Sequence, residues 1–182
     1  INPKLSPEKT DKGLTLSDKN INIYYALGLE INYYLNYFIG RFFDAIVDGK
    51  IIWRFFALRL ALKLLKANKY EAILSFSQPF SSATVGVCLK EKYPQIPLIS
   101  YFSDPWTINP YFSGLSASKT RANEEMEKKV MELSDTVVFC SQGILDSYTK
   151  KYGEIIRGKA FFIPHAFDLD LYPEIKEGSQ EK

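Results

Sequence analysis

Short apolar runs alternate with longer helical patterns from residue 72 to residue 163, and this alternation restricts the fold more than any other feature of the sequence. Four runs have the length and apolar content of buried strands, at residues 72–77, 98–102, 136–140 and 160–163. Helical patterns begin near residues 81, 119 and 143. Because this alternation is typical of parallel sheets covered by their connecting helices, the sequence predicts an α/β domain with a Rossmann-like parallel sheet and helices on both faces.

The N-terminal part has a different pattern. Residues 1–20 are polar, and we interpret them as a loop or a disordered lead-in. Residues 21–27 alternate in part, which predicts a short strand. From residue 30 onwards apolar side chains recur every three or four positions, and this spacing predicts an amphipathic helix that ends at Gly49.

A second amphipathic helix is predicted over residues 51–68, with apolar side chains on two opposite seams. The seam that contains Phe55 is expected to face the sheet. The other seam contains Trp53 and Phe56, and it is bordered by the basic residues Arg59, Lys63 and Lys66. An apolar face with a basic border is what a peripheral protein presents to anionic lipid. In the alternative interpretation, the two helices bury these side chains against each other and the sheet.

Length and composition exclude several classes of protein. With 182 residues the chain is long enough for one α/β domain and too short for two. Its net charge of +2 is far below the positive excess of a nucleic-acid-binding domain, so no nucleic-acid partner is expected. Cys88 and Cys140 are expected to be buried, reduced thiols, and a single histidine makes a metal site unexpected. No apolar run reaches the roughly 18 residues that span a bilayer, and a cytoplasmic location is expected.

In an open α/β sheet, ligands bind at the carboxyl ends of the strands. The strand over residues 72–77 ends in the polar residues Ser77 and Gln78, and Ser81 or Ser82 then begins a helix. The free amides and the positive dipole end of a helix N-terminus suit an anion or a hydroxyl group. The alternative is that these serines only cap the helix.

The second strand leads into Asp104, Pro105, Trp106 and Thr107. Proline holds the chain in an extended conformation and therefore aims the carboxylate and the indole from a fixed point. A carboxylate that accepts hydroxyl hydrogens, beside a ring that covers C–H faces, is a common arrangement for holding a sugar. The alternative is that Asp104 caps the loop and Trp106 fills the core.

Polar residues also follow the last two strands. Ser141 and Gln142 precede a helix, where capping is the alternative to ligand binding, and His165 follows Pro164 at the end of the final strand. A lone histidine at this place is more often structural than catalytic. The sequence contains no Gly-x-Ser-x-Gly turn, no second histidine and no glycine-rich phosphate loop.

Taken in order, these segments resemble the N-terminal, acceptor-side domain of family 4 glycosyltransferases, which have the GT-B architecture. The resemblance covers residues 53–168 and is carried by residues 69–82, 98–107 and 162–168. Its most specific element is the run Asp104–Pro105–Trp106. Relatives often show Asp–Phe–Arg–Asp–Pro–Trp, whereas this chain has Tyr101 and Ser103 in place of the first acid and the arginine. In the closing motif, Pro–Asn–Gly–Phe–Asp, His165 and Ala166 replace the asparagine and the glycine.

The resemblance implies a retaining hexosyltransferase that moves a sugar from a nucleotide-sugar to a glycan or lipid-linked acceptor, as in polysaccharide biosynthesis. Asp104 would orient an acceptor hydroxyl as the catalytic residue. The acceptor- or substrate-binding residues would be Ser77, Gln78, Ser81, Ser82, Trp106, Thr107, Ser141, Gln142 and His165. No cofactor or metal is implied beyond the nucleotide-sugar co-substrate.

The resemblance also implies how the chain is organised. It would be one half of a GT-B pair, with a partial Rossmann-like domain over residues 21–168 and a hinge and tail over residues 169–182. The family's opening strand and its glycine-rich loop are expected before residue 1. The nucleotide-sugar domain is expected after residue 182, so the chain alone is expected to be inactive. Two alternatives remain, namely a fragment of another GT-B or Rossmann-like sugar enzyme, and a non-catalytic module that binds a membrane or a partner.

Overall fold

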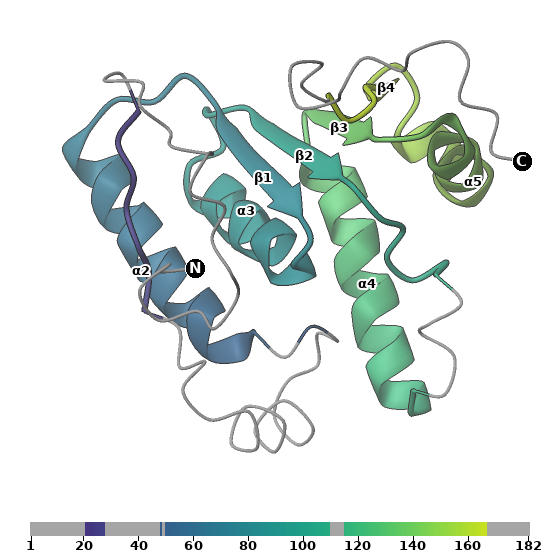
Figure 1. The fold of residues 1–182 in the computed structure, drawn as a ribbon, viewed down its shortest axis with the longest axis horizontal. Coiled ribbons are helices and arrows are strands. Elements are labelled where there is room, and N and C mark those ends of the chain that lie inside the picture. Colours follow the sequence, from purple (N-terminus) through teal and green to yellow (C-terminus); the bar gives the residue numbers. More distant parts are fainter. Residues whose placement is uncertain (1–20, 28–47, 49, 110–114, 167–182) are drawn as a thin grey trace, which may run out of the picture.

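The computed structural model describes residues 21–27, 48, 50–109 and 115–166. Its elements are α2 (Ile51–Ala67), β1 (Ile73–Ser77), α3 (Phe80–Lys92), β2 (Leu98–Phe102), α4 (Ala117–Leu133), β3 (Thr136–Phe139), α5 (Gln142–Tyr152), the 3₁₀ helix η2 (Gly153–Ile155) and β4 (Ala160–Phe162) (Figure 1). The four predicted strands are confirmed, as are the predicted helices that fall in the described residues.

The strands form one parallel sheet in the order β1-β2-β3-β4 (Figure 1). Each neighbour in the sheet is therefore the next strand in the sequence, and each connection contains one α-helix. Parallel crossovers are right-handed, so a sequential strand order places all the connecting helices on the same face. The prediction of an α/β, Rossmann-like parallel sheet is confirmed.

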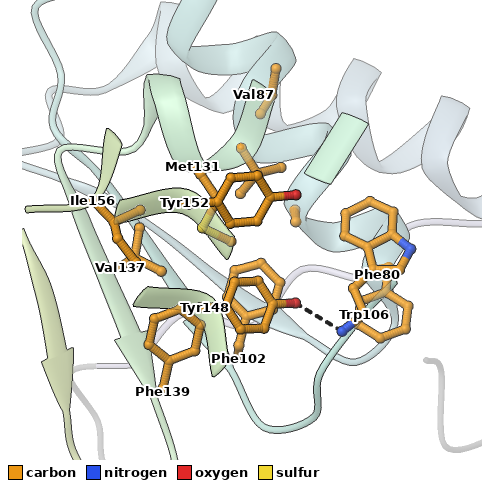
Figure 2. Packing of buried hydrophobic residues seen from close by; sticks show 12 residues of the cluster. Phe80, Val87, Phe102, Trp106, Met131, Val137, Phe139, Tyr148, Tyr152 and Ile156 are labelled. Carbon is orange, nitrogen blue, oxygen red and sulfur yellow. Dashed lines mark hydrogen bonds between the residues drawn. The ribbon is translucent and has the colours of Figure 1, made fainter. Parts of the chain in front are cut away.

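The helix-covered face of the sheet carries the core. Side chains at matching register positions, such as Phe102 and Phe139, meet side chains of α3, α4 and α5 in one apolar cluster (Figure 2). The buried members of the cluster are Phe80, Ala83, Val87, Phe102, Trp106, Val130, Met131, Val137, Phe139, Tyr148, Tyr152 and Ile156. Burying apolar surface at about 25 cal/mol per Å² makes this cluster the main source of stability for the described part of the chain.

The opposite face of the sheet is apolar and partly open. Leu74, Phe76 and Phe161 are 54%, 56% and 50% exposed, whereas Tyr101 and Val138 in the middle of the sheet are buried. The described helices that connect the strands all lie on the other face. The helix predicted from residue 30 to Gly49 lies outside the described residues except for Asp48, so a cover on this second face stays a prediction.

The predictions for residues 21–27 and for Cys88 are wrong. Residues 21–27 belong to no strand, and their large apolar side chains are exposed. A strand needs a sheet edge that takes up its backbone N–H and C=O groups, and partial alternation cannot supply that edge. Cys88 is exposed rather than buried, because it lies on the outer face of α3. The predicted lead-in over residues 1–20 and the tail over 169–182 lie outside the described residues.

Helix α3 packs very closely on the sheet at Gly86. A Cβ atom added to Gly86 would lie 3.0 Å from Cδ1 of Leu98 and 3.3 Å from Cβ of Ser75. Because Ser75 belongs to β1 and Leu98 to β2, the glycine lets the helix axis approach both strands. Helix α3 also packs against α2 and α4.

Candidate functional site

The carboxyl ends of β1, β2 and β3 are joined by hydrogen bonds through Ser103. Its backbone N–H and its hydroxyl both donate to the carbonyl oxygen of Ser77, at 2.8 Å and 2.7 Å, and the N–H of Gln78 donates to Oγ of Ser103 at 3.2 Å. The thiol of Cys140 donates to the carbonyl oxygen of Ser103 at 2.8 Å. We call Ser77, Gln78, Ser103, Asp104 and Cys140 the strand-end cluster.

Asp104 is the ionisable member of the strand-end cluster that sequence reasoning singled out. Its side chain is partly exposed, and its Oδ2 accepts a hydrogen bond of 3.2 Å from Oγ of Ser103. Burial raises the pKa of the Cys140 thiol, and the nearby negative charge of Asp104 raises it further. The carboxylate therefore lies at the sheet edge where ligands of open α/β sheets bind.

Ser77, a candidate ligand contact in the sequence, is buried in the structure. Its side chain is 1% exposed. Among the described residues, its hydroxyl is the one buried side-chain N or O atom without a hydrogen-bond partner. Gln78 follows it with an exposed side chain.

The N-terminus of α3 is already occupied by a carboxylate. Oδ2 of Asp48 accepts a hydrogen bond of 2.5 Å from the N–H of Ser81, and Oδ1 accepts one of 2.7 Å from its hydroxyl. Ser81 is buried and Ser82 partly buried, and the N–H of Ser82 donates to the carbonyl oxygen of Pro79 at 2.9 Å. Asp48 therefore fills the position that an anion would take. Ser81 does not cap the helix either, because α3 begins after Pro79 without a side-chain cap and Ser81 donates both of its hydrogens to Asp48.

Trp106 lies in the core. Its side chain is fully buried, and its ring stacks on Phe80 with a centroid separation of 4.8 Å and an interplanar angle of 8°. Nε1 donates to Oδ1 of Asn123 at 3.0 Å, and the backbone N–H donates to the hydroxyl of Tyr148 at 2.9 Å (Figure 2). The indole face is therefore not a surface on which a sugar can lie, and the core interpretation of Trp106 is the one that the structure shows.

Thr107 leads to a buried carboxylate that sequence reasoning did not identify. The N–H of Thr107 donates to Oε1 of Glu127 at 2.9 Å, and its hydroxyl donates to Oε2 at 2.6 Å. The hydroxyls of Tyr148 and Tyr152 each donate to the same carboxylate at 2.6 Å. Lys151 completes the group, with Nζ 2.7 Å from Oε2.

The ionisation of this group follows from its contacts. Burial alone would raise the pKa of Glu127, but hydrogen bonds from Lys151, Thr107, Tyr148 and Tyr152 outweigh burial and lower it. Burial, together with the charge of Glu127, raises the pKa values of both tyrosines. The carboxylate is therefore a buried, ionised and fully hydrogen-bonded acceptor. The signal in the sequence is its position, because Asn123, Glu127 and Val130 recur on the buried stripe of α4.

Ser141 and Gln142 lie at the start of α5. Oγ of Ser141 accepts a hydrogen bond of 3.2 Å from the N–H of Ile144, which is an ordinary N-cap. Nε2 of Gln142 donates to Oδ1 of Asp146 at 2.8 Å on the exposed surface of the helix. For Ser141, the capping alternative describes the contact that the structure shows.

His165 lies after β4 on the open face of the sheet. Its side chain is exposed, and Nδ1 is 3.2 Å from the hydroxyl of Tyr101. The same hydroxyl donates to the carbonyl oxygen of Ile163 at 3.4 Å. Burial raises the pKa of Tyr101, so the phenol stays protonated. The predicted site residues are thus divided between the strand-end cluster, the first turns of α3 and α5, the core and the open face.

Helix α2 presents its basic side chains to solvent. Arg59, Lys63 and Lys66 are exposed, and the guanidinium of Arg59 lies 5.6 Å from the ring centroid of Phe55. Phe55 is 56% exposed, so its assignment to the sheet-facing seam is wrong. Trp53 and Phe56 are partly buried. The exposed aromatic side chain beside the basic residues is Phe55.

Two further observations concern the described residues as a set. In the ranges that the structure describes, no group of three or more His, Cys, Asp or Glu side chains has the arrangement of a metal site. Within those same ranges, no helix has both the length and the apolar character that a membrane span requires.

The sequence pattern of Glycosyltransferase Family 4 matches residues 26–171. The chain belongs to this family. No curated protein matches the chain significantly. The family match contains every described strand, the Asp104–Thr107 loop and His165, so the strand-end cluster is part of a family 4 glycosyltransferase domain.

Proposed function

We propose that this family 4 glycosyltransferase domain forms the acceptor side of a retaining enzyme with GT-B architecture. The enzyme would transfer a hexosyl group from a nucleotide-sugar to a glycan or a lipid-linked acceptor during polysaccharide biosynthesis. The observation that carries the proposal is the position of Asp104 within a family 4 domain. Its partly exposed carboxylate lies at the carboxyl edge of the sheet.

In the proposed reaction, Asp104 accepts a hydrogen bond from the acceptor hydroxyl and orients its oxygen towards the anomeric carbon of the donor. One oxygen of the carboxylate, Oδ2, is engaged by Ser103. Oδ1 has no hydrogen bond in the described part of the chain and is the oxygen that would receive the acceptor. A fixed charge near the reacting atoms stabilises a charged transition state without reorganising solvent.

The other candidate residues have different roles in this proposal. Gln78 and His165 have exposed side chains beyond the ends of β1 and β4 and would contact the acceptor directly. Ser81, Trp106 and Ser141 are engaged by neighbouring protein groups and would support the site from below. Ser82 and Gln142 remain proposed contacts through their positions near the strand ends. Ser77 is buried and Thr107 is bound to Glu127, so these two would also support the site from below.

We further propose that the donor is bound by a second domain and that the chain alone is inactive. The nucleotide-sugar would be a co-substrate, with no metal or other cofactor. The exposed basic residues of α2, together with Phe55, favour an anionic membrane surface on the cytoplasmic side as an additional partner. Such a surface would bring the site close to a lipid-linked acceptor.

Substitution of Asp104 by asparagine in the full-length protein tests the proposal. The asparagine keeps the size of the side chain and removes its charge, so turnover should fall about 10²- to 10³-fold. The midpoint of unfolding should change little, because the side chain is partly exposed and makes one long hydrogen bond. Glu125→Gln, which removes an exposed carboxylate from α4, is the charge-matched control and should leave turnover unchanged. Full activity of Asp104→Asn would overturn the proposed role.

A further inference from the structure

The loop that follows Asp104 is held by side chains of α4 and α5. Tyr148 accepts a hydrogen bond from the N–H of Trp106, and Asn123 accepts one from the indole. Glu127 accepts hydrogen bonds from both the N–H and the hydroxyl of Thr107. Each polar hydrogen of these two loop residues is therefore bound by a helix that packs on the core.

Glu127 is the centre of this arrangement. Oε1 accepts from the N–H of Thr107 and from Tyr148, which in turn binds Trp106. Oε2 accepts from the hydroxyl of Thr107, from Tyr152 and from Lys151. A carboxylate that is 0% exposed is costly to bury, and apolar side chains of similar volume often stabilise a core as well or better. Stability alone therefore gives little reason for an acid at this position.

Asp104 itself makes few contacts that would fix its position. The hydrogen bond from Ser103 is 3.2 Å long and comes from a hydroxyl that also donates to Ser77. The position of the carboxylate consequently depends on the backbone on either side. Before Asp104, the chain is fixed by the contacts of Ser103 with Ser77 and Cys140. After it, rigid Pro105 leads directly to the residues held by Tyr148 and Glu127.

We propose that Glu127 is a positioning residue that sets the place of the Asp104 carboxylate by fixing the backbone at Trp106 and Thr107. The inference rests on the proposed function of Asp104. The carboxylate suits this task because one group with two oxygens binds the loop directly through Thr107 and indirectly through Tyr148. An amide at the same position accepts hydrogen bonds at only one of its two ends.

The thiol of Cys140 provides a probe of the loop that needs no substrate. It donates to the carbonyl oxygen of Ser103, and its pKa is raised by burial and by the charge of Asp104. Loosening of the loop should therefore make this thiol more reactive. In the full-length protein, labelling by a thiol reagent is followed by mass spectrometry of the peptide that contains Cys140, which separates it from the exposed Cys88.

Glu127→Gln should increase the labelling rate of Cys140 about tenfold or more, since a hydrogen bond to a buried charged group is worth about 1.5–3 kcal/mol. The rate should be insensitive to low concentrations of denaturant, because a local opening exposes little surface whereas global unfolding exposes much. Tyr152→Phe removes one hydrogen bond from the same carboxylate and leaves both of its contacts with Thr107. This matched control should label at nearly the wild-type rate.

Several labelling outcomes would overturn the inference. One is an unchanged rate in Glu127→Gln, and another is an equal acceleration in Tyr152→Phe. If Glu127→Gln does not fold, as judged by circular dichroism, Thr107→Val removes the hydroxyl partner on the loop side and should itself accelerate labelling. An unchanged rate in a folded Thr107→Val variant would then overturn the inference.

Turnover separates failure of this inference from failure of the proposed function. With a panel of UDP- and GDP-sugars, Glu127→Gln should lower kcat and leave the donor KM unchanged. The double variant with Asp104→Asn should be no slower than Asp104→Asn alone, because both substitutions remove the same interaction. If the two losses in turnover multiply in the double variant, Glu127 acts independently of Asp104. An active Asp104→Asn variant would instead overturn the proposed function, and with it the positioning role, even if the loop is loosened.

Discussion

The hydroxyl of Tyr101 lies 3.2 Å from Nδ1 of His165, and the contact passes over the end of β3, which separates β2 from β4 in the sheet. Both residues lie in segments that resemble family motifs, at positions where this chain has a different residue from the one that relatives often have. Tyr101 takes the place of an acid, and His165 takes the place of an asparagine. The two departures are therefore in direct contact, which a sequence comparison of either motif by itself does not reveal.

Removing the hydroxyl of Tyr101 should change the magnetic resonance signals of the His165 imidazole. Tyr101→Phe should shift the imidazole signals of His165, which are easily assigned because it is the single histidine among the 182 residues. Stability should fall by about 1 kcal/mol, the usual net value of one hydrogen bond. Tyr70→Phe alters an exposed tyrosine and is the control. Unchanged imidazole signals in Tyr101→Phe would contradict the contact.

The buried position of Trp106 predicts a large effect on stability. Trp106→Ala should lower the free energy of unfolding by about 3–5 kcal/mol, because it leaves a cavity beside Phe80 and removes the hydrogen bond to Asn123. Trp53→Ala, at a partly exposed position on α2, should cost clearly less. Denaturant titration monitored by circular dichroism compares the two variants. Equal losses would place the indole of Trp106 nearer to the surface than we describe.

Acid should destabilise the domain through Glu127. Its pKa in the folded state is lowered from the ordinary value of 4.5, so folding favours the ionised form. The resulting stabilisation is complete above the unfolded-state pKa and is lost as the pH falls through the lower folded-state pKa. Glu127→Gln should therefore weaken the fall in stability below about pH 4.5, when unfolding is measured across the acid range. Parallel pH profiles for the variant and the wild type would contradict this.

Donor binding should be weak in the chain alone. If a second domain holds the nucleotide-sugar, calorimetric titration of the 182-residue chain with common UDP- and GDP-sugars should give no tight signal. The full-length protein under the same conditions is the positive control. Tight, saturable binding by the chain alone would place the donor site within these residues.

Membrane binding should depend on the charge of α2. The chain should co-sediment with anionic vesicles at low salt and remain in solution with neutral vesicles, because exposed lysines and arginines attract anionic headgroups. Salt and Lys63→Glu should both weaken binding. Lys150→Glu makes the same charge change on an exposed residue of α5 and should have a smaller effect. A chain that stays in the supernatant with anionic vesicles has no such surface.

The sheet is predictable from the sequence because each strand is a short, mostly apolar run bounded by polar residues or proline. The bounds of 72–77 and 136–140 differ from those of β1 and β3 by one residue at one end. The run at 98–102 coincides with β2. Local pattern is sufficient here because the strands of a parallel sheet carry apolar side chains on both faces, although Leu74, Phe76 and Phe161 on the open face are about half exposed. Residues 21–27 show the limit of the method, since partial alternation does not provide a neighbouring strand.

The site is less predictable because its contacts join distant segments. Asp104 and its neighbourhood can be located from the strand end, but the direction of the Trp106 side chain depends on Phe80 and Asn123, which belong to two different helices. The cap on α3 comes from Asp48, at a distance of 33 residues in the sequence. Glu127 lies within a run of charged residues that looks solvated, and its burial becomes visible only when it is placed on the same stripe as Asn123 and Val130.

The close contact between α3 and the sheet at Gly86 makes the tilt of this helix depend on that position. Helix α3 touches Ser75 and Leu98 there, whereas its first turn is tied to Asp48 and leads back to Ser77 and Gln78 through Pro79. A side chain at this position would collide with Ser75 and Leu98 and would tilt the helix away from the sheet. The tilt would be passed to the end of β1, so a substitution outside the strand-end cluster would alter the shape of the sheet edge that carries this cluster.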